Sequence, residues 1–298
     1  MIPGAKGILI PIYIDAKEKE TMENLYQPKE IFQKYVAACE KKTSAKSTRT
    51  ILLGIMAGLF IALGAAGSSV SMYAIEPTGI ARTVGGAVFP IGLMMILVIG
   101  GELFTGNCML IGGVMDHRYS AGKMLKNLVL VYVSNFLGAV FAALLVVNSG
   151  QLAFSDCALG ANVIKTALGK ADMEFIPAFI SGILCNILVC AAVYMATGAK
   201  DMAGKLWAVF FPVFVFVICG FEHCVANMYY LSAGIFAAEN AAYAQKAMEL
   251  FGYSQVQLDV LNWRNALFCN LLPVTLGNMV GGMVIIGIPV TLLYKEKK

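Results

Sequence analysis

The sequence predicts an all-α membrane protein with six transmembrane helices in two inverted three-helix repeats, with broken second and fifth helices. Three observations predict this fold class. The 298 residues are 59% hydrophobic and 13% charged, a composition unsuited to a soluble globular surface. Several uncharged segments are long enough to cross a hydrocarbon core of about 30 Å as helices, and they lack the alternation of β-barrel strands. The two halves of the chain also share a pattern of polar residues inside apolar segments.

The chain is expected to divide into a cytoplasmic N-terminal segment, residues 1–48, and a single six-helix transmembrane domain, residues 49–298. Residues 1–21 contain a short apolar run with a proline in it, which does not fit a signal peptide. They admit two interpretations: a native segment, or a leader ahead of a natural start at Met22. Apolar residues recur at helical spacing in residues 28–40, which predicts an amphipathic helix on the membrane surface or a soluble capping helix.

The six spans follow from the uncharged segments. They are expected at about residues 50–75, 83–115, 128–147, 175–197, 206–238 and 265–294, with longer polar connections at residues 149–174 and 239–264. An even number of spans places both termini on one side, and lysine and arginine are concentrated on that side. The positive-inside rule therefore predicts a multi-pass protein of the cell (inner) membrane with both termini in the cytoplasm.

The second and fifth spans are each interrupted by a glycine, a glutamate and an asparagine, at residues 101–107 and 220–227. The third and sixth spans also resemble each other, around Asn135 and Asn278. Halves of three spans enter the membrane from opposite sides, so this similarity indicates an inverted repeat. Matching broken helices predict a translocation site near the midplane, where half-helix N-termini favour an anion.

One of only two histidines, His223, follows Glu222 in the fifth-span interruption. Ionisable groups at this depth are costly and usually face a solute path. The other histidine, His117, is expected on the surface. The eight cysteines lack CxxC spacing and are expected to be small core residues, and a single mid-membrane histidine offers too few ligands for zinc. No metal, cofactor or nucleic-acid partner is therefore expected.

From about residue 28 to residue 294 the sequence resembles the formate/nitrite transporter family. The resemblance depends on residues 102–105, 182–186, 220–227 and 270–278. It implies an aquaporin-like six-helix protomer that assembles as a homopentamer, with a pore in each subunit. It also implies two hydrophobic constrictions on either side of a central histidine.

The resemblance assigns roles to particular positions. The constrictions match Leu93, Leu103, Phe104, Phe216 and Phe89, the centre matches His223 and Thr105, the vestibule lysine matches Lys170, and pore-associated polar residues match Asn186, Asn278, Glu222 and Glu102. Each position also has a structural alternative: a helix cap for Thr105, backbone bonding for Glu222, a neutral hydrogen-bond donor for His223, a solvated charge for Lys170, and core packing for the apolar residues.

These positions predict a channel or transporter for small monovalent anions. A bare anion in an apolar pore faces a large desolvation cost that its neutral acid avoids, and a histidine with an ordinary pKa near 6.5 can share a proton. Formate is the first candidate substrate, with nitrite or hydrosulfide as alternatives, and proton co-movement is left open. A neutral-solute pore is disfavoured because no Asn-Pro-Ala motif occurs, and a membrane enzyme using Glu222 and His223 is disfavoured because ligands are too few.

Overall fold

The computed structural model describes residues 25–296, so the alternative interpretations of residues 1–21 lie outside the described residues. In that part of the chain, six helical segments are long and apolar enough to span a membrane. They are Ser47–Met72, Thr78–Ile99, Ala121–Asn148, Phe175–Gly198, Met202–Cys219 and Trp263–Tyr294. Two shorter apolar segments, Phe104–Met115 and Cys224–Ala238, continue the second and fifth spans after a break. The predicted six-span helical fold is confirmed.

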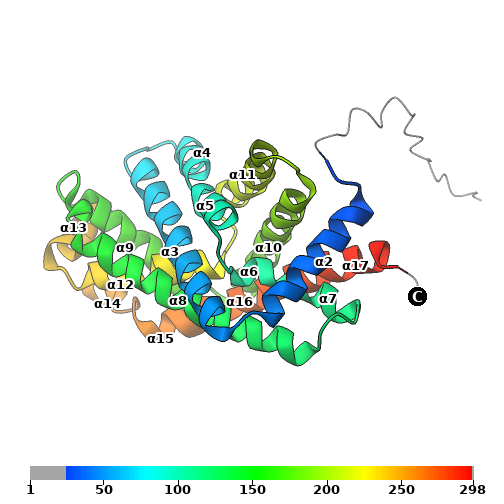
Figure 1. Cartoon of the computed structure of the whole chain (residues 1–298). Helices are drawn as coiled ribbons and strands as arrows, with labels where there is room; N and C mark the ends of the chain where they lie inside the picture. Colours follow the sequence, from blue (N-terminus) through cyan, green and yellow to red (C-terminus); the bar gives the residue numbers. More distant parts are fainter. Residues whose placement is uncertain (1–24, 297–298) are drawn as a thin grey trace, which may run out of the picture.

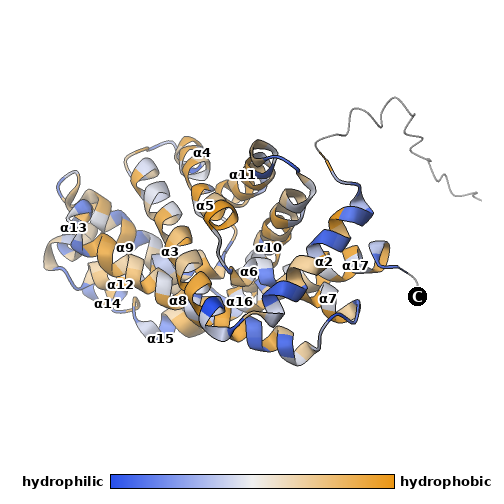
Figure 2. Cartoon of the chain, viewed as in Figure 1, coloured by the Kyte–Doolittle hydropathy of each residue, from blue (hydrophilic) through white to orange (hydrophobic). Residues whose placement is uncertain are grey.

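The first half of the chain contains one surface helix and three spans. Its helices are α2 (Pro28–Ser44), α3 (Ser47–Met72), α4 (Thr78–Val88), α5 (Ile91–Ile99), α6 (Phe104–Asn107), α7 (Ile111–Met115) and α8 (Ala121–Asn148), with the 3₁₀ turn η1 (Cys108–Leu110) between α6 and α7. Figure 2 shows apolar residues dominating α5 and polar residues gathered on α2.

The second half repeats this order. After the turn η2 (Gln151–Ala153) it contains α9 (Ala158–Ala171), α10 (Phe175–Gly198), α11 (Met202–Cys219), α12 (Cys224–Ala238), α13 (Ala241–Phe251), α14 (Gln255–Leu258), α15 (Trp263–Asn265), α16 (Leu272–Met279) and α17 (Ile288–Tyr294). Two π-helical segments, η3 (Ala266–Leu271) and η4 (Val280–Gly287), join α15, α16 and α17 into one continuous span.

The two polar connections predicted at residues 149–174 and 239–264 are largely helical, a feature that the sequence interpretation did not include. The first contains α9, whose buried residues pack against α12 and α13. The second contains α13 and α14. The helices in these connections are too short to span a membrane. Lysines and acidic residues lie close to their apolar residues, so the hydropathy pattern does not distinguish them from polar loops.

The repeat therefore begins one helix earlier than the spans alone indicate, with α2 ahead of α3 and α9 ahead of α10. In Figure 1, α2 and α17 lie on the right of the view and α9 and α13 lie on the left. We call these ends the α2 face and the α9 face. Because the two surface helices lie at opposite ends, the two halves are inverted relative to each other.

A glycine in a left-handed or otherwise positive-φ conformation ends the first half of each broken span. Gly100 has a φ of 107° and Gly220 a φ of 70°. Residues other than glycine adopt these backbone conformations only at a cost in free energy. Three non-helical residues follow each glycine before α6 and α12 begin. Both breaks thus turn the chain sharply and leave backbone groups that need partners from elsewhere in the bundle.

Glycines also allow the spans of each half to pack closely. A Cβ on Gly58 of α3 would meet the backbone of Asn135 on α8, and a Cβ on Gly281 of η4 would meet the backbone of Ile183 on α10. Small residues at such positions let two helix backbones approach closely. These contacts lie within one chain, and they bring the polar residues of the third and sixth spans to the breaks.

Candidate functional site

The first break is held by Asn135 of α8. Its Nδ2 donates to the carbonyl oxygens of Gly54 and Glu102, both at 2.8 Å, and its Oδ1 accepts a 2.9 Å hydrogen bond from the backbone N–H of Phe104. One amide side chain therefore connects α3, the broken segment and the start of α6. Buried backbone groups without partners are costly, so this side chain makes the interruption tolerable.

The second break is held in the same way by Asn278 of α16. Its Nδ2 donates to the carbonyl oxygens of Gly182 at 2.7 Å and Glu222 at 3.0 Å, and its Oδ1 accepts from the N–H of Cys224 at 2.9 Å. The donors and acceptors match those around Asn135 one for one. The inverted repeat is thus present at the level of individual hydrogen bonds.

A glutamate carboxylate lies inside each break. Glu102 is buried, and its Oε2 accepts a 2.6 Å hydrogen bond from Asn107 Nδ2 and lies 3.2 Å from Lys42 Nζ. Lys42 Nζ also donates to Asn107 Oδ1 at 2.7 Å, while Asn107 Nδ2 contacts Asn127 Oδ1 at 2.9 Å. A buried carboxylate without a cation would be strongly destabilising, and Lys42 supplies that cation from the surface helix α2.

Glu222 has the equivalent partners in the second half. Lys170 Nζ donates to both carboxylate oxygens, at 2.8 and 2.9 Å, and Asn227 Nδ2 donates to Oε2 at 2.5 Å. Asn227 also contacts Asn270 Oδ1 at 2.7 Å, and Asn270 Nδ2 reaches the backbone oxygen of Lys170 at 3.1 Å. Lys170 is thus engaged with a carboxylate on the α9 face.

Thr105 of α6 and His223 at the start of α12 meet where the two breaks approach each other. Thr105 Oγ1 lies 2.9 Å from His223 Nε2, and both residues are buried. His223 Nδ1 accepts a hydrogen bond of 3.1 Å from the backbone N–H of Ala226, so the imidazole is the N-cap of α12. An accepting Nδ1 carries no proton, which assigns the proton of the neutral ring to Nε2 and makes Thr105 Oγ1 its acceptor.

Asn186 of α10 connects this pair to both halves. Its Nδ2 donates to the backbone oxygens of Thr105 at 3.1 Å and Asn278 at 2.6 Å, and the side chain is fully buried. The thiol of Cys190, one turn later, contacts the same Thr105 oxygen at 3.4 Å. The backbone of Thr105 is therefore fixed from α10, which orients its hydroxyl toward His223.

The apolar residues singled out by the sequence surround this centre. Leu93, Leu103, Phe104, Phe216 and Phe89 are all buried in one hydrophobic cluster. The rings of Phe89 and Phe216 meet edge to face with centroids 5.5 Å apart, and the Phe216 ring stacks on His223 at 5.9 Å. Leu103 and Phe104 immediately precede Thr105. The polar pair is thus buried beside apolar side chains, with the Phe216 ring in direct contact with His223.

Sequence analysis missed the role of Lys42 and of the asparagines at 107, 127, 227 and 270. A signal was present: Lys42 precedes Ser47, the first residue of α3, by five positions, and Lys170 precedes Phe175, the first of α10, by five. The asparagines at 127 and 135 and those at 270 and 278 are each eight residues apart. A comparison of the halves that included the surface helices would have found these positions.

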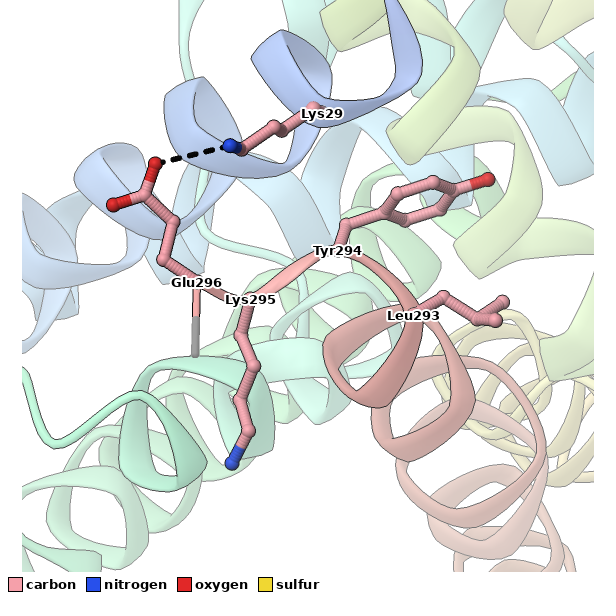
Figure 3. Close-up of a pocket in the computed structure, with 5 residues that line it drawn as sticks. All are labelled: Lys29, Leu293, Tyr294, Lys295 and Glu296. Carbon is pink, nitrogen blue, oxygen red and sulfur yellow. Dashed lines mark ion pairs between the residues drawn. The ribbon is translucent and has the colours of Figure 1, made fainter. Parts of the chain in front are cut away.

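Two cavities lie on the α2 face, away from both breaks. One, of about 430 Å³, is bordered by α2 and the end of α17, and there Lys29 Nζ lies 3.2 Å from a carboxylate oxygen of Glu296 (Figure 3). The other, of about 510 Å³, includes His117, which is exposed and has a φ of 59°. The sequence expectation that His117 is a surface residue agrees with this exposure.

Known proteins resemble this chain over most of its length. A family model described as formate/nitrite transporter matches residues 29–292. A probable formate transporter of Methanothermobacter thermautotrophicus is 38% identical over 268 residues, covering 84% of this chain and 90% of the relative. The formate channel FocA of Haemophilus influenzae is 34% identical over 249 residues, covering 83% and 87%.

Solved structures give the same result. A pentameric formate channel with formate bound superimposes with a TM-score of 0.74 at 31% identity, covering 84% of this chain and 98% of that chain. An ion channel of the same family superimposes with a TM-score of 0.74 at 28% identity, covering 89% and 98%. The family consists of transporters and channels, and its model covers the six spans and both breaks. The chain is therefore a multi-pass membrane protein that belongs to the formate/nitrite transporter family.

Proposed function

We propose that this protein conducts formate, with nitrite and hydrosulfide as weaker substrates, through a pore in each subunit. The observation that carries the proposal is the hydrogen bond between Thr105 and His223. Because the Nε2–H of His223 donates to Thr105 Oγ1, the hydroxyl proton of Thr105 is left to donate to a passing solute. A carboxylate oxygen is a strong acceptor for such a donor. Relatives named as formate channels support this assignment.

The apolar residues provide size selection in this proposal. Phe89 and Phe216 form the constriction toward the α9 face, and Leu103 with Phe104 forms the one toward the α2 face. Leu93 lies on α5, one turn closer to the first break than Phe89. Their burial around a single polar pair favours solutes that shed most of their water. A small anion can replace part of its hydration with the Thr105 hydroxyl, whereas a larger acid cannot pass the rings.

Proton co-movement requires more than a histidine with an ordinary pKa. The other ring nitrogen must also be free to accept a proton. If neutral His223 gave its Nε2 proton to formate, the ring would become an imidazolate unless Nδ1 gained a proton at the same time. Nδ1 is occupied as the acceptor of the Ala226 N–H. We therefore assign proton co-movement to a state in which the α12 cap is broken, and assign the capped state to hydrogen bonding of the anion alone.

The glutamates act as structural groups in this proposal. Glu102 and Glu222 are each paired with a lysine and an asparagine, so their charges are compensated and their backbones are held at the breaks. The charge of Lys170, which sequence similarity matches to a vestibule residue, is compensated by Glu222. Asn186 and Asn278 fix the backbone around Thr105 and His223 and thereby orient the pair.

We further propose a homopentamer in the cell membrane with the α2 face in the cytoplasm. The solved pentameric formate channel supports the assembly, and the excess of lysine and arginine on the α2 face supports the orientation. Residues 1–48 then form a cytoplasmic segment ahead of the transmembrane domain 49–298, with α2 lying along the membrane surface.

Flux into liposomes tests the proposal. Purified protein is reconstituted, and uptake of formate, nitrite, hydrosulfide, lactate and glycerol is measured at pH 5 and pH 8, with protein-free liposomes as the control. We expect formate uptake to exceed that of the other solutes and lactate uptake to be smallest among the anions. Glycerol uptake without formate uptake would contradict the proposal and leave a neutral-solute pore as the function.

A further inference from the structure

We propose that Arg82 is a further anion-binding residue of the transport path, at the mouth of the pore on the α9 face. Its guanidinium would collect monovalent anions before they reach Phe89 and Phe216. The inference rests on the proposed function, because it names a residue that serves the same path.

Arg82 lies on the side of α4 that faces α11. Its Nη1 donates to the carbonyl oxygen of Ile218 in the last turn of α11 at 3.3 Å, and the same nitrogen would lie 3.2 Å from a Cβ on Gly220. The C-terminal end of a helix carries partial negative charge, which favours a cation there. The Arg82 side chain is therefore held against Gly220, the glycine of the second break, which lies two residues before Glu222.

The spacing along α4 connects Arg82 to the apolar constriction. Gly86 and Phe89 follow Arg82 by four and seven residues, so the three share one face of the helix. Gly86 packs against Ile218, and the Phe89 ring contacts the Phe216 ring. Arg82 thus lies two helical turns from the phenylalanine pair along the face that contacts α11.

The start of α4 belongs to the α9 face. The preceding helix α3 ends at Met72, and the next residue, Tyr73, hydrogen-bonds through its hydroxyl to Ser155 Oγ at 2.6 Å, in the loop ahead of α9. From Thr78 the chain turns back toward the centre. Arg82, in the second turn of α4, is exposed and lies between that surface and the phenylalanine pair.

The charge balance of the α9 face favours Arg82 over the lysines. Lys170 is bonded to both oxygens of Glu222, and Lys246 is paired with Asp156. Within residues 25–296, Arg82 has no carboxylate oxygen within 4.0 Å. A compensated ion pair attracts a distant anion far less than an isolated cation does. Lys165 and Arg264 also have no such partner in this part of the chain, but of these three cations Arg82 is the one that contacts the last turn of α11, next to the second break.

The guanidinium also has donors to spare. It carries five N–H groups in a planar fork suited to a carboxylate, and one of its nitrogens is bonded to Ile218. The remaining edge can bind both oxygens of formate. Because the side chain is exposed, binding there is weak, which lets the anion move on to the constriction.

The test compares Arg82→Gln and Arg82→Lys with the wild type and with Arg264→Gln. Gln removes the charge and retains a donor for the Ile218 oxygen, Lys retains the charge, and Arg264 is an exposed cation on α15, in the last span. Initial rates of formate uptake are measured against formate concentration at about 10 mM and about 1 M ionic strength, where the Debye length is about 30 Å and 3 Å. Thermal unfolding of each variant checks that the fold is retained.

At low ionic strength we expect Arg82→Gln to raise the KM for formate roughly fivefold, the factor for one charge about 4 Å away in water, with an unchanged maximal rate. Arg82→Lys and Arg264→Gln should stay within twofold of the wild type, and the difference should vanish at high salt. An unchanged KM in Arg82→Gln, or a change that persists at 1 M salt or in Arg82→Lys, overturns the inference. Absence of formate uptake by the wild type would instead overturn the proposed function.

Discussion

The two breaks have the same supporting residues but different central residues. Asn135 and Asn278 make matching sets of three hydrogen bonds, and Glu102 and Glu222 each bind a lysine and an asparagine. The residues that follow the glutamates differ: Leu-Phe-Thr at 103–105 and His-Cys-Val at 223–225. One half thus supplies the hydroxyl and the other supplies the imidazole. The duplicated residues maintain the breaks, and the unmatched residues perform the proposed chemistry.

The largest expected effect is on the duplicated asparagines. Asn278→Leu leaves the oxygens of Gly182 and Glu222 and the N–H of Cys224 without this partner. An unpaired buried group costs about 1–3 kcal/mol, so we expect a loss of roughly 5 kcal/mol of stability, measured by thermal unfolding in detergent. Asn135→Leu should cost a similar amount. A loss below about 1 kcal/mol in either variant would contradict the equivalence of the two halves.

The next largest effect is the loss of stability when Lys170 or Lys42 is replaced, and it should differ between the two lysines. Lys170→Met leaves buried Glu222 without its cation, and we expect a loss of about 3 kcal/mol. The Lys42 side chain is 32% exposed against 17% for Lys170, and its Nζ contacts only one carboxylate oxygen. Lys42→Met also leaves a buried carboxylate without its cation, but because Lys42 is more exposed it should cost less than Lys170→Met, about 2 kcal/mol. Denaturation midpoints of the purified variants measure both.

A double variant provides the control for the lysine comparison. Glu222→Gln removes the charge that Lys170→Met leaves unpaired, so the combined variant should recover most of the lost stability. If the double variant is as unstable as Lys170→Met alone, the lysine acts through packing and the charge argument fails.

A third effect is on transport, and it tests the difference between Thr105 in the first break and Val225 at the corresponding position of the second. Thr105→Val keeps the shape of the side chain but removes the hydroxyl, so we expect formate uptake to fall about tenfold, the equivalent of one hydrogen bond of about 1.4 kcal/mol. Val225→Thr is the matched change at the corresponding buried position of the other half. It should leave uptake within twofold per folded protein, and an equal fall in both variants would show that uptake reports folding alone.

The smallest effect is expected at the α9 surface. Lys246 Nζ lies 2.8 Å from Asp156 Oδ2, and this contact holds the pKa of the Asp156 carboxyl below its usual value. A lowered folded-state pKa means that the pair stabilises the protein at neutral pH and that this contribution disappears as the pH falls through that pKa. Asp156→Asn should slightly lower the unfolding temperature at neutral pH and have no effect once wild-type Asp156 is protonated. A difference that grows on acidification would contradict this sign.

Sequence patterns predicted the spans and breaks because long uncharged segments are typical of membrane helices, and a glutamate inside such a segment is costly unless it serves the bundle interior. They failed for α9 and α13, whose buried faces are too short to resemble a span. Lys42 was missed for another reason: a lysine ahead of a span usually reports topology, and only the folded chain shows which carboxylate it reaches. The pairing of Thr105 with His223 followed from family resemblance, because their separation of 118 residues carries no local signal.

The bond from Ala226 N–H to His223 Nδ1 has a consequence for anyone who redesigns this channel. The ring that bonds to Thr105 also caps the start of α12, so a replacement is judged first by whether it can start a helix. Asn, Asp and Ser meet that requirement, whereas Leu and Ala do not. Many members of a library that varies residue 223 freely would lose this cap, at a cost of about 0.5–2 kcal/mol of stability each. Altered substrate preference is more accessible at Thr105, whose side chain caps no helix.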